Sequence, residues 1–165
     1  MNFYALFGFP VKPVVDTSQL AKKYFELQRQ SHPDFYSQSD SMEKEDALEK
    51  SAAINKAFTI FKDEYKTLEY YLELKAVVTE NEKYELSPAF LMEMLELNDD
   101  LEHTDPVDMI AKVAAVEKEL KEPILALLQA DDNEPDAAAL AKLKDFYYKK
   151  KYLDLWNEMN AVVFD

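Results

Sequence analysis

The chain contains 165 residues, of which 48% are hydrophobic, with one glycine, no cysteine and a formal net charge of −14. This length fits one medium domain or two small ones, and the apolar fraction argues against an intrinsically disordered chain despite the charge. Phosphate-binding loops and tight hairpin turns depend on glycine, so the single glycine disfavours the common nucleotide-binding enzymes and most all-β folds.

Other missing features narrow the class of protein further. Without cysteine the chain has no disulfide, no thiol nucleophile and no cysteine ligand for zinc or an iron–sulfur cluster. The N-terminal sequence MNFYALFGFP has no basic region and no long apolar core, so it does not read as a secretory signal, and no apolar run approaches the ~18 residues of a membrane span. We therefore expect a soluble cytoplasmic protein with no membrane partner. Its acidity also predicts no nucleic-acid partner, because it would repel the phosphate backbone.

The negative charge is concentrated in the second half of the chain. Residues 1–76 hold 10 Lys and Arg against 12 Asp and Glu, a net charge of −2. Residues 77–165 hold 9 against 21, a net charge of −12. This asymmetry predicts two modules with different partners. We place the first domain at 1–76, a polar linker at 77–86 and the second domain at 87–165.

The first module is predicted to be helical throughout. The apolar run 3–7 predicts a short helix that ends at Gly8. Asp16 to Gln19 form a predicted N-cap box, with the first residue capping a helix and the last reaching back. That helix should extend to about Ser31, because Pro33 pushes the residue before it out of the helical region.

Two more helices follow in the first module. A long helix should begin near Met42, after a polar stretch, and residues 63–75 predict a shorter one. Apolar spacing predicts which side chains face inward. They are Ala47, Ile54, Ala57, Phe58 and Phe61 in the long helix, and Leu68, Tyr71 and Leu72 in the short one.

Start signals for helices recur in the second module. Ser87-Pro88 predicts a helix that extends to about Glu102, and Thr104-Asp105-Pro106 predicts the next, running towards Gln129. Pro123 should kink or interrupt this second helix.

The last predicted helix completes the second module. Asp136 should cap it, and it should run almost to the end of the chain. Three helices joined by short loops predict an antiparallel three-helix bundle. The fold class that we expect is therefore all-α.

The tripeptide His32-Pro33-Asp34 stands between two predicted antiparallel helices. Proline ends the first helix, so the imidazole and the carboxylate are held out on a short loop where a partner can reach them. An ordinary loop is the alternative. An acid–base pair is disfavoured because no nucleophile or glycine-rich oxyanion loop accompanies it.

The order of elements around this tripeptide resembles a J-domain: a short apolar helix, then a basic helix, the tripeptide and a long helix. The stretches LQRQSHPD at 27–34 and SAAINKAF at 51–58, with the opening segment 3–10, resemble the HscB co-chaperones, the J-domain proteins of iron–sulfur cluster assembly. In the second module, AFLMEMLEL at 89–97 is similar to the FLME-x-LEL segment of the HscB C-terminal domain.

This resemblance implies a function as well as a fold. The fold would be an N-terminal J-domain, a helical hairpin with short flanking helices, followed by a client-binding helical domain. The protein would be a co-chaperone rather than an enzyme, with no cofactor or metal of its own. It would bring an IscU-type scaffold to an HscA- or DnaK-type ATPase and stimulate ATP hydrolysis there. The residues that would contact the chaperone are Lys22, Lys23, Arg29, His32, Pro33 and Asp34.

The helix predicted to start at Pro88 has two apolar faces. At 100° per residue, Phe90, Met94, Leu97 and Leu101 fall within about 60° and form a core stripe. Another face carries the leucines and methionine at 91, 92 and 95, together with acidic side chains. From the residues alone, this second face either widens the core, packs against the first module or binds a partner.

The resemblance favours partner binding for the second face. It implies that the scaffold docks through this helix and through one aromatic residue of the last helix. We assign that aromatic to Tyr152, with Tyr147 as the alternative register. The complete predicted scaffold-binding set is Leu91, Met92, Leu95, Glu96, Asp99 and Tyr152.

Two other functions remain open from the sequence. The chain could be a J-domain protein with a different client, or a helical adaptor without ATPase coupling. A metal site around His103, near Asp99, Glu102 and Asp105, is disfavoured because it offers one imidazole at an exposed helix end.

Overall fold

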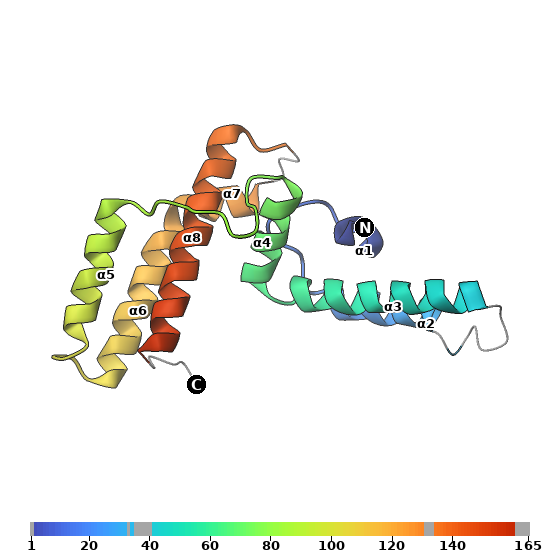
Figure 1. The fold of residues 1–165 in the computed structure, drawn as a ribbon, viewed down its shortest axis with the longest axis horizontal. Helices are drawn as coiled ribbons and strands as arrows, with labels where there is room; N and C mark the ends of the chain where they lie inside the picture. The colour runs from blue at the N-terminus through green and yellow to red at the C-terminus, as the bar shows by residue number, and fades with distance from the viewer. Residues whose placement is uncertain (1, 33, 35–40, 131–133, 161–165) are drawn as a thin grey trace. The chain divides into compact units, whose positions relative to one another are not determined.

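The computed structural model describes residues 2–32, 34, 41–130 and 134–160. The regular elements formed by these residues are all helices, with no strand among them, which confirms the predicted fold class (Figure 1). The chain separates into two compact units, Met1–Leu74 and Lys75–Asp165. Within the described ranges, no helix is long and apolar enough to cross a membrane.

The first unit opens with the short helix α1, Phe3–Phe7. The side chain of Asn2 caps it by accepting hydrogen bonds from the backbone N–H groups of Tyr4 and Ala5. The helix ends at Gly8, whose φ of 69° is left-handed. A residue with a Cβ adopts this conformation at a cost, so the only glycine of the chain lies where the backbone requires one.

Helix α2, Leu20–Ser31, starts differently from the sequence prediction. The carboxylate of Asp16 accepts a hydrogen bond from the backbone N–H of Ser18 at 2.9 Å, which closes a turn rather than capping a helix. Gln19 occupies the N-cap position without a capping hydrogen bond from its side chain. The predicted N-cap box is therefore wrong, although the helix and its end at Ser31 are confirmed.

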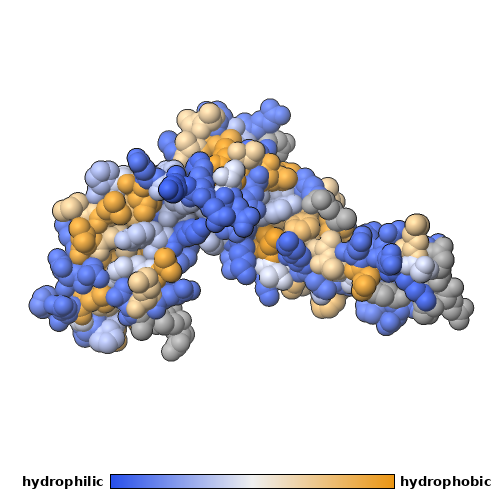
Figure 2. All heavy atoms as spheres, viewed as in Figure 1, coloured by the Kyte–Doolittle hydropathy of each residue, from blue (hydrophilic) through white to orange (hydrophobic). Residues whose placement is uncertain are grey.

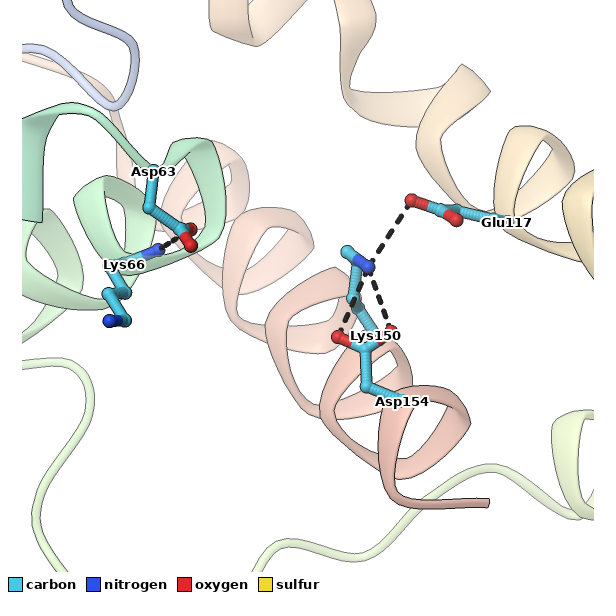
Figure 3. Close-up of polar contacts among 5 residues, drawn as sticks. All are labelled: Asp63, Lys66, Glu117, Lys150 and Asp154. Carbon is cyan, nitrogen blue, oxygen red and sulfur yellow. Dashed lines mark hydrogen bonds and ion pairs between the residues drawn. The ribbon is translucent and has the colours of Figure 1, made fainter. Parts of the chain in front are cut away.

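Helices α3, Ser41–Phe61, and α4, Glu64–Leu74, complete the first unit. Helix α3 lies antiparallel to α2 (Figure 1), and the carboxylate of Asp63 starts α4 by accepting from the backbone N–H of Lys66 at 2.9 Å (Figure 3). An apolar core joins α1, α2 and α3. Its buried members are Tyr4, Phe7, Val15, Leu20, Leu27, Ile54, Ala57 and Phe61.

The second unit is built on three longer helices, α5 (Pro88–Asp100), α6 (Pro106–Lys121) and α8 (Ala137–Met159). Successive members of this set run in opposite directions, as predicted (Figure 1). Between α6 and α8 lie a 3₁₀ turn, η2 (Glu122–Ile124), and the short helix α7 (Leu125–Gln129). The 3₁₀ turn contains Pro123, so the predicted interruption at this proline is confirmed.

Each of the three long helices begins at the residue that the sequence indicates. The side chains of Ser87, Asp105 and Asp136 accept hydrogen bonds from the backbone N–H three residues later, at 3.3, 2.9 and 2.8 Å. These contacts satisfy donors that have no partner inside the helix. The bundle core then comprises Phe90, Met94, Leu97, Met109, Val113, Val116, Leu153 and Trp156.

The segment between residues 75 and 87 has no helix, and its second half is fixed to α8. The carboxylate of Glu82 accepts hydrogen bonds from Lys144 Nζ at 2.6 Å and from the hydroxyl of Tyr148 at 2.8 Å. The ring of Tyr84 stacks on that of Tyr148, with centroids 4.4 Å apart. The hydroxyl of Tyr84 donates to Asp145 at 2.8 Å. Burial, with Asp145 beside it, raises the pKa of Tyr84 to about 12.

An ion-pair network joins α6 to α8 on the flank of the bundle. Lys150 Nζ lies 2.9 Å from Asp154 Oδ1 and 3.2 Å from Glu117 Oε1 (Figure 3). Burial of Lys150 opposes its charge, but the two carboxylates outweigh burial and raise the pKa of the ammonium group. This lysine therefore stays charged while it joins a carboxylate of α6 to one of α8.

Candidate functional site

The tip of the α2–α3 hairpin exposes both titratable members of the tripeptide. His32 ends α2 with an extended backbone, and the side chains of His32 and Asp34 are 49% and 90% exposed. The Nδ1 atom of His32 accepts a hydrogen bond from the backbone N–H of Asp34 at 3.2 Å and lies 3.4 Å from its Oδ2 atom. Pro33 lies outside the described residues.

The predicted basic residues lie along α2. Lys22 and Arg29 are exposed, and Lys23 is half-buried on a different side of the helix. The opposite side of α2 is buried through Leu20 and Leu27. The structure therefore leaves the charged side of α2 open, next to the tip of the hairpin.

The two apolar faces predicted on α5 differ in burial. Phe90, Met94 and Leu97 are buried in the bundle. On the second face, Leu91, Met92 and Leu95 are 38%, 58% and 59% exposed. Glu96 and Asp99 are exposed as well, so acidic side chains border this apolar surface. Figure 2 shows hydrophobic surface over α5 on the side that faces the viewer.

The two candidate tyrosines of α8 differ strongly in exposure. Tyr147 is 3% exposed and belongs to the interior, whereas Tyr152 is 39% exposed. The ring of Tyr152 meets that of Phe90 edge to face, with centroids 5.7 Å apart. Of these two residues, Tyr152 is the one that can take part in a surface with the exposed side of α5.

The predicted absence of a metal site concerns the acidic side chains and the two histidines. In the part of the chain that the structure describes, no three His, Cys, Asp or Glu side chains gather closely enough to hold a metal ion. His103 lies exposed just after α5, at the helix end predicted from the sequence.

Comparisons with known proteins decide the family. Residues 86–158 match a family model described as the HSCB C-terminal oligomerisation domain. The co-chaperone protein HscB homolog of Shewanella amazonensis is 33% identical over 173 residues, and the match covers 99% of both chains. The chain belongs to the HscB family of co-chaperones.

Solved HscB structures share the fold of this family member. Human co-chaperone HscB has a TM-score of 0.78 at 25% identity, covering 98% of this chain and 81% of the human chain. HscB from Vibrio cholerae has a TM-score of 0.63 at 26% identity, covering 96% of this chain and 99% of the other. The predicted fold class, a J-domain followed by a C-terminal helical bundle, is therefore that of HscB structures.

Sequence reasoning missed exposed apolar residues beside both surfaces of this HscB-family chain. On α8, Leu155 and Met159 are exposed and lie within about 60° of Tyr152 around the helix axis. On α2, Phe25 is exposed among the basic residues. Spacing within each helix gives these angles, but exposure depends on where the neighbouring helices lie.

Proposed function

We propose that this chain binds an IscU-type iron–sulfur scaffold through α5 and α8, presents it to an HscA- or DnaK-type chaperone in the cytoplasm, and stimulates that chaperone's ATP hydrolysis. One observation carries the proposal. The two compact units each expose a surface of their own, a charged hairpin tip in the first and an apolar helix face in the second. Two surfaces of different chemistry suit two different partners.

The first unit would engage the ATPase. Lys22 and Arg29 carry positive charge on the open side of α2, which would speed encounter with an acidic partner surface. His32 and Asp34 would then fix the pose at close range, since the exposed carboxylate of Asp34 can take a bidentate hydrogen bond from an arginine.

The second unit would hold the scaffold. Leu91, Met92 and Leu95 give an apolar centre, and Glu96 and Asp99 give an acidic border. This is the arrangement of an interface core and its polar rim. Tyr152 adds an aromatic ring from α8, and the exposed Leu155 and Met159 extend the surface along the same helix.

Joining the two units in one chain accounts for the coupling. Because the scaffold and the J-domain are tethered, binding of one partner raises the local concentration of the other. The iron–sulfur cluster is cargo of the scaffold, so this chain contributes binding and orientation and needs no metal ligand of its own.

Steady-state ATP hydrolysis by the chaperone tests this function. The wild-type chain should accelerate hydrolysis, and His32→Gln should abolish the acceleration while scaffold binding, measured by titration calorimetry, stays unchanged. His103→Gln is the matched control, because it removes the other histidine of the chain from an exposed helix end. Acceleration retained by His32→Gln would contradict the role of the tip. Acceleration without scaffold binding would indicate a J-domain protein with a different client.

A further inference from the structure

The charged side of α2 carries a large aromatic residue at its middle. Phe25 is 62% exposed. It lies three residues after Lys22 and four before Arg29, so the three side chains fall within about 60° around the helix axis. Phe25 is therefore part of a cluster with two cations on one helix face, and it is not an isolated apolar residue on a polar surface.

Phe25 is supported by an ordered row of rings. Its ring meets that of Tyr24 edge to face at 5.4 Å, and Tyr24 packs on Phe58 of α3 at 4.3 Å. The hydroxyl of Tyr24 donates to Asn55 Oδ1 at 2.7 Å, and Gln28 donates to the same atom at 2.9 Å. The row of Phe25, Tyr24 and Phe58, called here the aromatic row, is therefore held in place before any partner arrives.

A cation just after the end of α3 lies at the other end of the aromatic row. Lys62 Nζ is 5.7 Å from the centroid of the Phe58 ring, within the range of a cation–π contact. The aromatic row thus begins beside Lys22 and Arg29 on α2 and ends under Lys62, the residue that follows α3. Positive charge flanks the aromatic surface on both sides.

We propose that Phe25 is an apolar anchor for the ATPase chaperone and inserts into an apolar depression bordered by acidic groups. This inference rests on the proposed function and adds a binding residue to it. Charge complementarity favours an acidic protein surface, and a preorganised aromatic beside an arginine is typical of interface hot spots. An extended polyanion such as a membrane or a nucleic acid suits the site less well than a local acidic patch, because it would also meet the rest of a chain that carries −14 overall.

The test compares Phe25→Ala with the wild-type chain in binding to a DnaK-type ATPase. Loss of one buried aromatic anchor should raise Kd by about tenfold or more. The maximal stimulated rate should be retained at saturation, because His32 and Asp34 are intact. The salt dependence of Kd should be unchanged in Phe25→Ala and weaker in Lys22→Ala, which removes a charge instead. Phe25→Leu should retain most of the affinity.

Leu48→Ala is the matched control, because Leu48 is 61% exposed on α3 of the same unit. It should bind the ATPase like the wild-type chain, and both variants should keep their helical circular dichroism. Wild-type affinity in Phe25→Ala, or an equal loss in Leu48→Ala, would overturn the anchor while leaving the proposed function standing. Binding to anionic vesicles should also be measured. If Phe25→Ala weakens binding to these vesicles but leaves binding to the ATPase unchanged, the anchor is overturned as well. No stimulation by the wild-type chain would instead overturn the proposed function.

Discussion

The ring of Tyr152 on α8 meets the ring of Phe90 on α5 edge to face, with centroids 5.7 Å apart and ring planes at 79°. Phe90 is 3% exposed and Tyr152 is 39% exposed, so one ring belongs to the core and the other covers it from outside. This contact links the exposed side of α8 to the helix that carries the apolar surface. It also explains why Tyr152 can be ordered without being buried.

The contact predicts different consequences for the two tyrosines of α8. Tyr152→Ala should weaken scaffold binding at little cost in stability, because its ring is partly in solvent. Tyr147→Ala should lower the free energy of unfolding by about 3–5 kcal/mol, as expected for truncation of a buried aromatic. Calorimetric titration with the scaffold and thermal unfolding separate the two effects. A Tyr152→Ala protein that binds normally would remove this residue from the site.

The apolar face of α5 predicts a binding defect without unfolding. Leu91→Ala/Leu95→Ala should reduce affinity for an IscU-type scaffold by at least about tenfold, because two side chains lose buried apolar area in the complex. Circular dichroism should show unchanged helicity, since both side chains are exposed in the free protein. Val107→Ala is the control, as Val107 is 74% exposed on α6. Equal affinity in the double variant and the control would place the site elsewhere.

Local signals account for what the sequence predicted well. Ser87 and Asp105 each precede a proline that fits the first helical turn, and Asp136 precedes three alanines, so nothing nearby competes for the capping oxygen. Asp16 is followed by Thr17 and Ser18, whose backbone forms a turn with it instead. The same residue type therefore caps one helix and closes a turn before another.

Long-range packing accounts for what the sequence could not predict. Tyr147 and Tyr152 both lie on a helix with apolar residues on several faces, and only packing against the rest of the structure decides which tyrosine is buried. The contacts of Glu82 and Tyr84 with α8 span about sixty residues of sequence, so no local pattern marks them. The exposure of Phe25 likewise depends on where α3 packs.

The different roles of two aspartates give a stability prediction. Asp136→Ala should lower the free energy of unfolding by about 1 kcal/mol, because it leaves the backbone N–H of Ala139 without its cap. Asp16→Ala should cost less, since it removes a turn contact that is not a helix cap. Denaturant unfolding of each variant measures the difference. A larger loss for Asp16→Ala would restore the capping role that the sequence suggested.

Glu93 on α5 gives a prediction about pH. Burial and the nearby carboxylate of Glu119 raise the pKa of Glu93 above its ordinary value of 4.5. The folded protein therefore holds this proton more tightly than the unfolded chain. The resulting stabilisation is complete below the unfolded pKa and is lost as pH rises through the folded pKa. At pH 7 the carboxylate of Glu93 is ionised, and this lowers the free energy of unfolding relative to the protonated form.

Glu93→Gln should accordingly raise the melting temperature at pH 7 by a few degrees, and the gain should disappear below about pH 4, where the wild-type carboxyl is protonated. Glu85→Gln removes one negative charge at an exposed position outside the helices and reports the effect of net charge alone. Melting curves of the three proteins from pH 3 to pH 8 provide the measurement. A gain that persists undiminished at pH 3, or matches that of Glu85→Gln throughout, would mean that the raised pKa of Glu93 does not limit stability.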